Sequence, residues 1–122
     1  MRSTDLNGLI GAHPDCLVAA YADIGTGVTL LTSTDSTVPR EALDDLCVEA
    51  ALTLGPGDIP PLGAEPCPQA IKVDATAIYV YLRAPDDPSD ALICKCRPTI
   101  ALSSFLKDAR ACFVAGAAEG RV

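Results

Sequence analysis

The pattern of hydrophobic and polar positions is most informative over residues 71–97 of the 122-residue chain. Residues 71–74 alternate between apolar and polar side chains, which is the period of a half-buried β-strand. The alternation stops at 77–82, where an unbroken apolar run predicts a strand near the middle of a sheet, with protein on both faces. Residues 91–97 form the return strand, so the whole segment predicts an antiparallel meander. The turns between these strands fall at two polar segments, 74–76 and 85–90.

A shorter pair of strands precedes the meander. Residues 16–22 are nearly all apolar, and residues 28–32 form a second run of strand length. Residues 23–27 between them contain two glycines, which permit the positive φ of a tight reversal. These features predict a hairpin over about 16–33.

Helical spacing of apolar residues occurs near both ends of the chain. The first helix is predicted over 3–12, with Ser3 or Thr4 as its N-cap and an end at Gly11 and the following His13-Pro14. A last helix follows Pro98-Thr99 and is expected to stop at Gly116. Its apolar stripe consists of Phe105, Leu106, Ala109, Cys112 and Phe113.

The helix predicted over 39–54 has the clearest amphipathic pattern. Caps are available at 33–37, Pro39 suits the first helical turn, and Gly55 is a natural stop. The Pro- and Gly-rich residues 55–69 then predict an irregular connection within one domain. The apolar stripe of this helix consists of Leu43, Leu46, Cys47, Ala50 and Leu54.

The order α-ββ-α-βββ-α predicts an α/β (α+β) fold, a single domain over 1–122 with one antiparallel sheet and helices on its faces. The net charge of −7 argues against nucleic acid and anionic membrane surfaces as partners. No apolar window has the ~18–20 residues that span a bilayer, and the first residues lack the apolar core of a secretory signal. We therefore expect a cytoplasmic protein without nucleic-acid binding or membrane insertion.

Six cysteines and one histidine raise the question of a metal or thiol site. The chain has no C-x-x-C pair, and His13 has no ligand-like spacing, so we expect no metal, cofactor or catalytic set. Cys94 and Cys96 share one strand face at about 6.6–6.8 Å between Cα atoms, the far edge of disulfide geometry. Core packing is the expected role of five cysteines, Cys16, Cys47, Cys94, Cys96 and Cys112. Cys67, between two prolines, is expected to be the most exposed.

Other candidates for chemistry also favour structural roles. Asp44 and Asp45 are adjacent on a helix and point about 100° apart, so they cannot act as paired carboxylates. Tyr79 and Tyr81 share one strand face and are expected in the core or an interface. No phosphate-binding glycine loop is present, so we expect no binding of GTP by the chain itself.

The chain resembles the Roadblock family, small α/β domains that include dynein light chains of the Roadblock type and bacterial companions of Ras-like GTPases. The resemblance lies in Leu6-Asn-Gly-Leu9, in CLVAAYADIGTGVTLLTST, and in the helix 39–54 followed by the strands at 71–97 and a final helix. It implies a five-stranded antiparallel sheet, with the helix 39–54 on one side and the terminal helices on the other. It also implies dimerisation and a scaffolding role without catalysis.

On this basis we expect a homodimer, or a heterodimer with a paralogue, that pairs through the strand at 71–74 and the helix 39–54. The expected further partner is a small Ras-like GTPase. Its docking residues would be the charged positions of the helix, Arg40, Glu41, Asp44, Asp45 and Glu49. The alternative for these charges is a solvated helix face. Two other classes remain open: a profilin-like or PAS-like sensor, and a thiol or metal protein.

Overall fold

The computed structural model describes residues 2–33, 38–55 and 68–119. The helices are α1 (Ser3–Ala12), α2 (Arg40–Leu54) and α3 (Leu102–Glu119). The strands are β1 (Cys16–Asp23), β2 (Val28–Thr32), β3 (Gln69–Val73), β4 (Ile78–Arg83) and β5 (Asp90–Cys96). The predicted order α-ββ-α-βββ-α is therefore confirmed. None of the helices in these ranges is long and apolar enough to cross a membrane.

The five strands form one sheet in the order β2-β1-β5-β4-β3, and every neighbouring pair is antiparallel. The predicted hairpin and meander are both present, and they join through β1 and β5. The central strand is therefore β5, and β4 lies beside it, near the middle of the sheet as the apolar run at 77–82 predicted. That run correctly indicated burial, because β4 has strands on both sides and ends in four consecutive buried residues.

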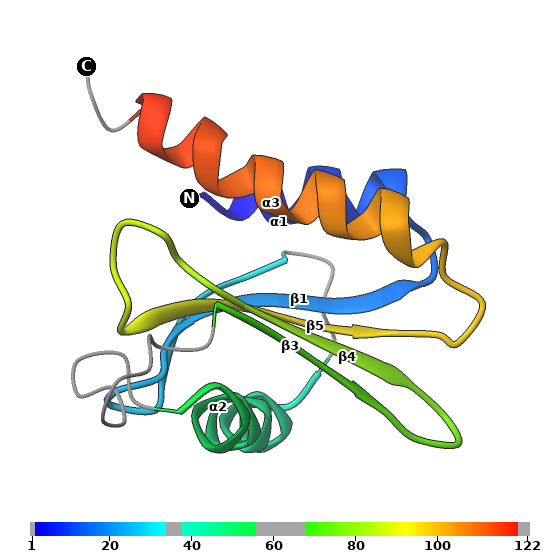
Figure 1. The fold of residues 1–122 in the computed structure, drawn as a ribbon, viewed down its shortest axis with the longest axis horizontal. Coiled ribbons are helices and arrows are strands. Elements are labelled where there is room, and N and C mark those ends of the chain that lie inside the picture. Colours follow the sequence, from blue (N-terminus) through cyan, green and yellow to red (C-terminus); the bar gives the residue numbers. More distant parts are fainter. Residues whose placement is uncertain (1, 34–37, 56–67, 120–122) are drawn as a thin grey trace.

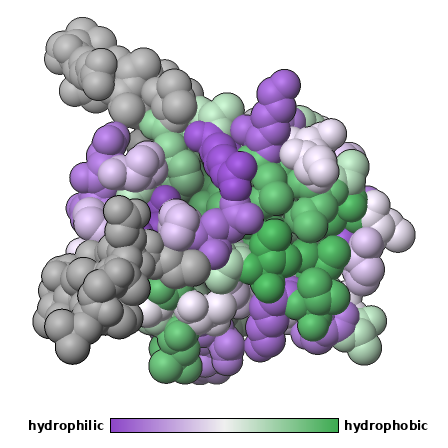
Figure 2. Space-filling view, in the orientation of Figure 1, coloured by the Kyte–Doolittle hydropathy of each residue, from purple (hydrophilic) through white to green (hydrophobic). Residues whose placement is uncertain are grey.

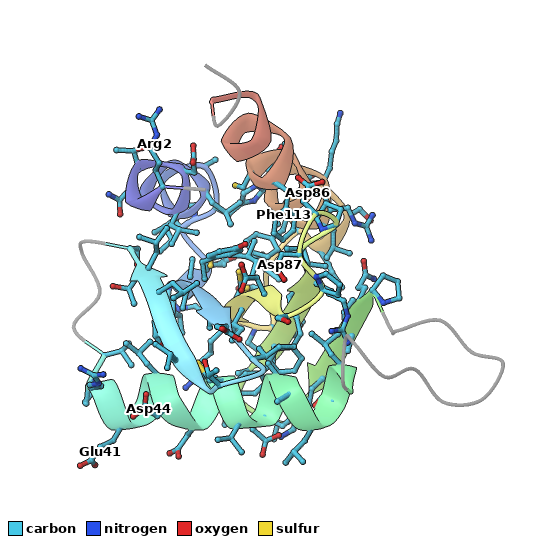
Figure 3. All side chains as sticks on the ribbon, turned by 90° about the vertical axis from the view of Figure 1, so that its left-hand side faces the viewer. Arg2, Glu41, Asp44, Asp86, Asp87 and Phe113 are labelled. Atoms are coloured by element: carbon cyan, nitrogen blue, oxygen red, sulfur yellow. The ribbon has the colours of Figure 1, made fainter. Side chains whose placement is uncertain are left out.

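Helices cover both faces of the sheet (Figure 1). The helices α1 and α3 lie side by side on one face, and α2 lies on the opposite face, as the resemblance implied. Figure 1 shows α2 end-on and Figure 3 shows it lengthwise, so α2 runs across the strands. It begins near β2 and ends near β3 and β4.

Small side chains fill much of the space between the layers. On the α1 and α3 side the buried core consists of Leu6, Leu9, Cys16, Ala19, Val80, Leu82, Leu92, Cys94, Cys96, Ile100, Phe105, Ala109 and Cys112. On the α2 side the larger buried cluster consists of Ala22, Ile24, Cys47, Ala50, Leu54, Tyr81, Ala91 and Ile93. Because alanine and cysteine are short, they allow a helix to approach the sheet closely.

A bulge in β1 decides which side chains reach each layer. Cys16 pairs with Cys96 and Val18 with Lys95, so Leu17 is the extra residue. The bulge reverses the in-out alternation, and Cys16 packs under α1 and α3 whereas Val18 packs toward α2. Strict alternation would have placed both on one face.

Side-chain oxygens close the predicted turns. The Asp74 carboxylate accepts the backbone N–H groups of Thr76 and Ala77, each at 2.8 Å. These hydrogen bonds stabilise the ionised form and hold the pKa of Asp74 below its ordinary value. In the β1–β2 turn, the Asp23 carboxylate accepts the Gly25 N–H at 2.9 Å, and only Gly27 has positive φ (+75°).

The helix starts differ from the predicted caps. Arg2 is the N-cap residue of α1, rather than Ser3 or Thr4. The Asp5 carboxylate accepts the Arg2 backbone N–H at 2.8 Å and supplies the capping interaction from inside the helix. Pro39 is the N-cap of α2 and makes no side-chain cap bond, so it precedes the first turn that it was expected to occupy. The other proposed caps, at 34–37, lie outside the described residues.

The predicted end of α3 at Gly116 is wrong, because the helix continues to Glu119. Glycine costs only about 1 kcal/mol relative to alanine inside a helix. Here Gly116 lies among Ala115, Ala117 and Ala118, which are the best helix formers. By contrast Gly55, with φ of +77°, does end α2 as predicted.

Five cysteines lie in the described ranges, and all five are buried free thiols. Their expected packing role is confirmed for Cys47 under α2 and for the others under α1 and α3. Burial raises the pKa of the Cys47 and Cys112 thiols, because desolvation disfavours the thiolate. Cys67 lies outside the described residues.

One charged side chain, Arg83, is buried with 8% exposure at the end of β4. Its Nη2 donates to the carbonyl oxygens of Leu54 (2.9 Å) and Gly55 (2.8 Å), and its Nη1 donates to that of Pro88 (2.5 Å). The first two carbonyls belong to the C-terminal end of α2, where the helix dipole favours a cation. Arg83 therefore joins α2 to the sheet and to the turn before β5.

We predict that Arg83→Met lowers the free energy of unfolding by about 2–4 kcal/mol, because buried carbonyls lose a charged donor. Urea denaturation followed by circular dichroism measures the change. The control is Arg97→Met, whose guanidinium is 58% exposed and 3.7 Å from the Asp15 carboxylate. It should cost no more than about 1 kcal/mol, and an equal loss in both variants would contradict the role of Arg83.

We also predict that the five described thiols resist a bulky thiol reagent in the native protein and react fully after unfolding. The physical reason is their burial under helices. Titration with a chromogenic disulfide, with and without denaturant, measures both values. Rapid native reaction of most thiols, or one equivalent of tightly bound zinc, would contradict the packing role.

Candidate interaction surface

The charged residues proposed for docking all lie on α2, at Arg40, Glu41, Asp44, Asp45 and Glu49. The first four are exposed to solvent. In Figure 3 Glu41 lies at the N-terminal end of α2 and points away from the sheet. Glu49 is different, because its carboxylate lies 3.3 Å from the Lys72 Nζ of β3. The structure thus leaves four of the five available and joins the fifth to the edge of the sheet.

Two apolar residues of α2 that the sequence analysis did not single out are also exposed. Val48 is 54% and Leu52 is 76% exposed. Val48 and Leu52 follow Glu41 and Asp45 at intervals of three and four residues along the helix. This spacing places all four on the side of α2 opposite its buried stripe. We call Glu41, Asp44, Asp45, Val48 and Leu52 the outer face of α2. This face is acidic in its N-terminal half and apolar in its C-terminal half.

The strand β3 offers a second exposed surface. Among the described strands it pairs only with β4, so one side of its backbone has no neighbouring strand in that part of the chain. Val73 at its end is 67% exposed, and Ile71 is half-buried. Figure 2 looks onto this edge and shows hydrophobic residues gathered between α3 and α2. The predicted edge strand at 71–74 is thereby confirmed.

Lys72 does little to protect this edge from pairing. Its ammonium group lies by the Glu49 carboxylate and 5.6 Å from the centre of the Tyr79 ring. Both partners are on the α2 side of the sheet, so the charge is directed along that face. A charged side chain prevents pairing of an edge strand when it projects toward an approaching strand, and the Lys72 side chain does not project in that direction.

The opposite edge, β2, is less suited to pairing. Leu31 pairs with Tyr21 and Thr29 with Ala22, which makes Leu30 the extra residue of a bulge. A bulge twists an edge strand and interrupts its ladder. Of the two edge strands, β3 is therefore the one whose pairing with its neighbour has no bulge, which suits it better to pair with a further strand.

The remaining candidates for chemistry have structural positions. His13 connects α1 to α3, because its Nε2 is 2.6 Å from the Asp108 Oδ2 and its ring meets Phe105 edge to face. Tyr81 is completely buried under α2 and Tyr79 packs beside it, as expected. Within the described ranges, no three His, Cys, Asp or Glu side chains are grouped to hold a metal ion.

An open hollow of about 330 Å³ lies between the sheet and α3. Its walls are formed by Pro68, Gln69, Leu82, Arg83, Pro85, Arg110 and Phe113. The Arg83 guanidinium is already bound to backbone carbonyls on the α2 side. A ligand sensor needs several polar groups that converge in the pocket, whereas Arg83, one of the three polar residues that line the hollow, is directed to the α2 side.

No family profile and no curated protein matches the sequence. Solved structures do match it over nearly the whole chain. A Roadblock/LC7 domain from Streptomyces avermitilis has a TM-score of 0.77 at 10% identity, and the match covers 98% of each chain. MglB from Myxococcus xanthus has a TM-score of 0.69 at 11% identity, covering 91% of this chain and 87% of that one. An MglB with a tetrameric arrangement has a TM-score of 0.69 at 14% identity, covering 92% and 82%.

The chain therefore has the Roadblock/LC7 fold, and the predicted resemblance is confirmed at the level of the fold. The neighbours include MglB proteins as well as a domain named only for its fold. At 10–14% identity, the likeness lies in the arrangement of helices and strands rather than in shared side chains.

Proposed function

We propose that this protein is a non-catalytic scaffold that dimerises and, as a dimer, binds and regulates a small Ras-like GTPase. The observation that carries the proposal is the Roadblock fold with two exposed surfaces, the β3 edge and the outer face of α2. The resemblance of the sequence to Roadblock domains implied the same role. One of the structural neighbours is described as tetrameric, which supports self-association as a property of the fold.

The dimer would form by antiparallel pairing of β3 with β3 of a second copy, or of a paralogue. Such a contact uses the same surface on both subunits and extends the sheet across a two-fold axis. The C-terminal half of α2 lies close to this edge, as the Glu49–Lys72 ion pair shows. Val48 and Leu52 would then pack against the partner copy and lose their exposure to water.

We predict that the protein is a dimer at micromolar concentration and that Val48→Glu/Leu52→Glu shifts it toward a monomer of 12.6 kDa. Burial of two carboxylates against an apolar surface would weaken association by at least about tenfold. Light scattering coupled to size exclusion measures the mass. The matched control is Leu17→Glu, because Leu17 is also exposed, at 42%, but lies on β1.

A monomeric wild type without a paralogue partner in the cell would contradict the dimer. Equal dissociation by Leu17→Glu would contradict the position of the interface.

The acidic N-terminal half of α2 is the proposed surface for the GTPase. Glu41, Asp44 and Asp45 carry three exposed negative charges near the start of the helix, with Arg40 beside them. This part of α2 lies near β2, away from the β3 edge, so it would stay accessible in the dimer. Exposed charges contribute mainly to the association rate and to specificity.

We predict that Asp44→Lys/Asp45→Lys weakens binding to the genomically neighbouring small GTPase by about tenfold or more at low salt. Added salt should weaken the wild-type complex, because exposed charges are screened over a Debye length of about 8–10 Å. Calorimetric titration with the GTPase loaded with GTP or GDP measures both effects.

The matched control is Asp86→Lys/Asp87→Lys, which makes the same charge change at an exposed acidic pair in the β4–β5 turn, apart from Glu41 and Asp44 at the N-terminal end of α2 (Figure 3). Unchanged binding by the α2 variant would exclude this face, and the control variant should bind like wild type. No binding in either nucleotide state would exclude that GTPase as a partner.

A further inference from the structure

Three thiols meet at one end of the sheet, beneath α1 and α3. Cys16 begins β1, and Cys94 and Cys96 lie on the adjacent strand β5. Cys16 is 2% exposed and the other two are fully buried. The Cys16 thiol donates to the Val18 carbonyl oxygen at 3.4 Å, and all three sulfurs belong to the same buried core. The proposed GTPase role uses none of the three.

The strand register makes Cys16 and Cys96 direct cross-strand partners. The Arg97 N–H donates to the Asp15 carbonyl at 2.7 Å, and this bond flanks the Cys16–Cys96 pair. The pair is therefore a non-hydrogen-bonded one, in which Cα atoms lie about 4.5 Å apart and side chains are close. That separation falls within the range of about 4.4–6.8 Å found for disulfides.

The register disfavours the other combinations. Cys94 lies opposite Ala19, so it is displaced along the strand from Cys16. Diagonal neighbours of this kind are about 7–8 Å apart, beyond disulfide geometry. Cys94 and Cys96 alternate on one strand at about 6.6–6.8 Å, the extreme of the range.

The surroundings of the three sulfurs also differ. Contacts with the Cys94 and Cys96 thiols lower the pKa of Cys16, although burial opposes this shift. The same contacts and burial raise the pKa of Cys94 and Cys96 above its ordinary value. Of the three thiols, Cys16 is therefore the one that loses its proton most readily. Thiolates, rather than thiols, are the nucleophiles in sulfur chemistry.

We propose that Cys16 and Cys96 form a peroxide-responsive dithiol that closes to a cross-strand disulfide. The Cys16 thiolate attacks one oxygen of hydrogen peroxide, forming a sulfenic acid and releasing hydroxide. Hydroxide takes the proton of Cys96, which gives the first water, and the Cys96 thiolate then attacks the sulfenic sulfur and displaces hydroxide. This hydroxide takes up the proton that Cys16 released when it ionised, which gives the second water. Two thiols and one peroxide thus give one disulfide and two waters.

A disulfide at this position would lock the ends of two strands. Cys16 follows the turn from α1, and Cys96 precedes the turn to α3, so the bond would fasten the point where both helices leave the sheet. Closing the loop from 16 to 96 restricts the unfolded chain. The oxidised protein should therefore unfold at a temperature several degrees higher than the reduced protein.

The test uses the folded chain with Cys67→Ser, which removes the thiol that the sequence predicts to be exposed. After hydrogen peroxide treatment, denaturation and alkylation, three thiols rather than five should be modified, since five cysteines remain and two are joined. Trypsin cleaves after Lys95 and separates Cys94 from Cys96. The disulfide should connect the peptide 3–40 to the peptide 96–107.

Two variants and one condition serve as controls. Cys94→Ala should still form the bond, and Cys96→Ala should instead retain a sulfenic acid on Cys16 that a dimedone reagent labels. Oxidation in denaturant should give mixed connectivities, because the register no longer selects a partner. Five alkylated thiols after peroxide treatment of the folded protein, or a bond from 3–40 to 84–95, would overturn the proposal.

Discussion

The pairing of β1 with β5 is the constraint on which the rest of the structure depends. It joins the N-terminal hairpin to the meander, and the seven paired positions run from Cys16–Cys96 to Asp23–Asp90. Alanine or cysteine occupies half of the paired residues, so both helical layers can approach the middle of the sheet. The same pairing makes β2 and β3 the two edges. Which surfaces are free for partners therefore follows from a contact between segments about 70 residues apart.

The residue pattern predicted the elements, whereas their assembly was implied only by the resemblance to a known family. Apolar runs and turn residues located the strands, because side-chain period and turn chemistry are local properties. The β1–β5 pairing is not local, and no period distinguishes it from pairing through β3. The bulge at Leu17 was equally hidden, since CLVAAYAD is apolar at odd and even positions alike. A uniform run of this kind does not show where alternation reverses.

The candidate surface was predicted in part, and for a similar reason. Helical periodicity placed Glu41, Asp44 and Asp45 away from the core. The predicted docking residues were all charged, so they did not include Val48 and Leu52, which the same periodicity leaves exposed. The role of Arg83 had no sequence signal, because it depends on the carbonyls at the end of α2 lying above the end of β4. Glu49 is joined to Lys72 by the same crossing of α2 over the strands. Both interactions are products of the tertiary arrangement.

The two faces of the sheet differ in the chemistry that they can support. Under α2 the buried groups with polar atoms include Tyr81, Cys47 and Arg83, and the Arg83 guanidinium donates to three carbonyl oxygens. Under α1 and α3 the sheet carries sulfur, and burial there keeps water from competing with S–H hydrogen bonds. Among the described residues, the thiols lie beneath helices, whereas the exposed side chains of the outer face of α2 and of the β3 edge lie on the outside of the molecule. The proposed binding of partners would therefore use the exterior, and the proposed dithiol would meet a small neutral oxidant through a local opening of the layer.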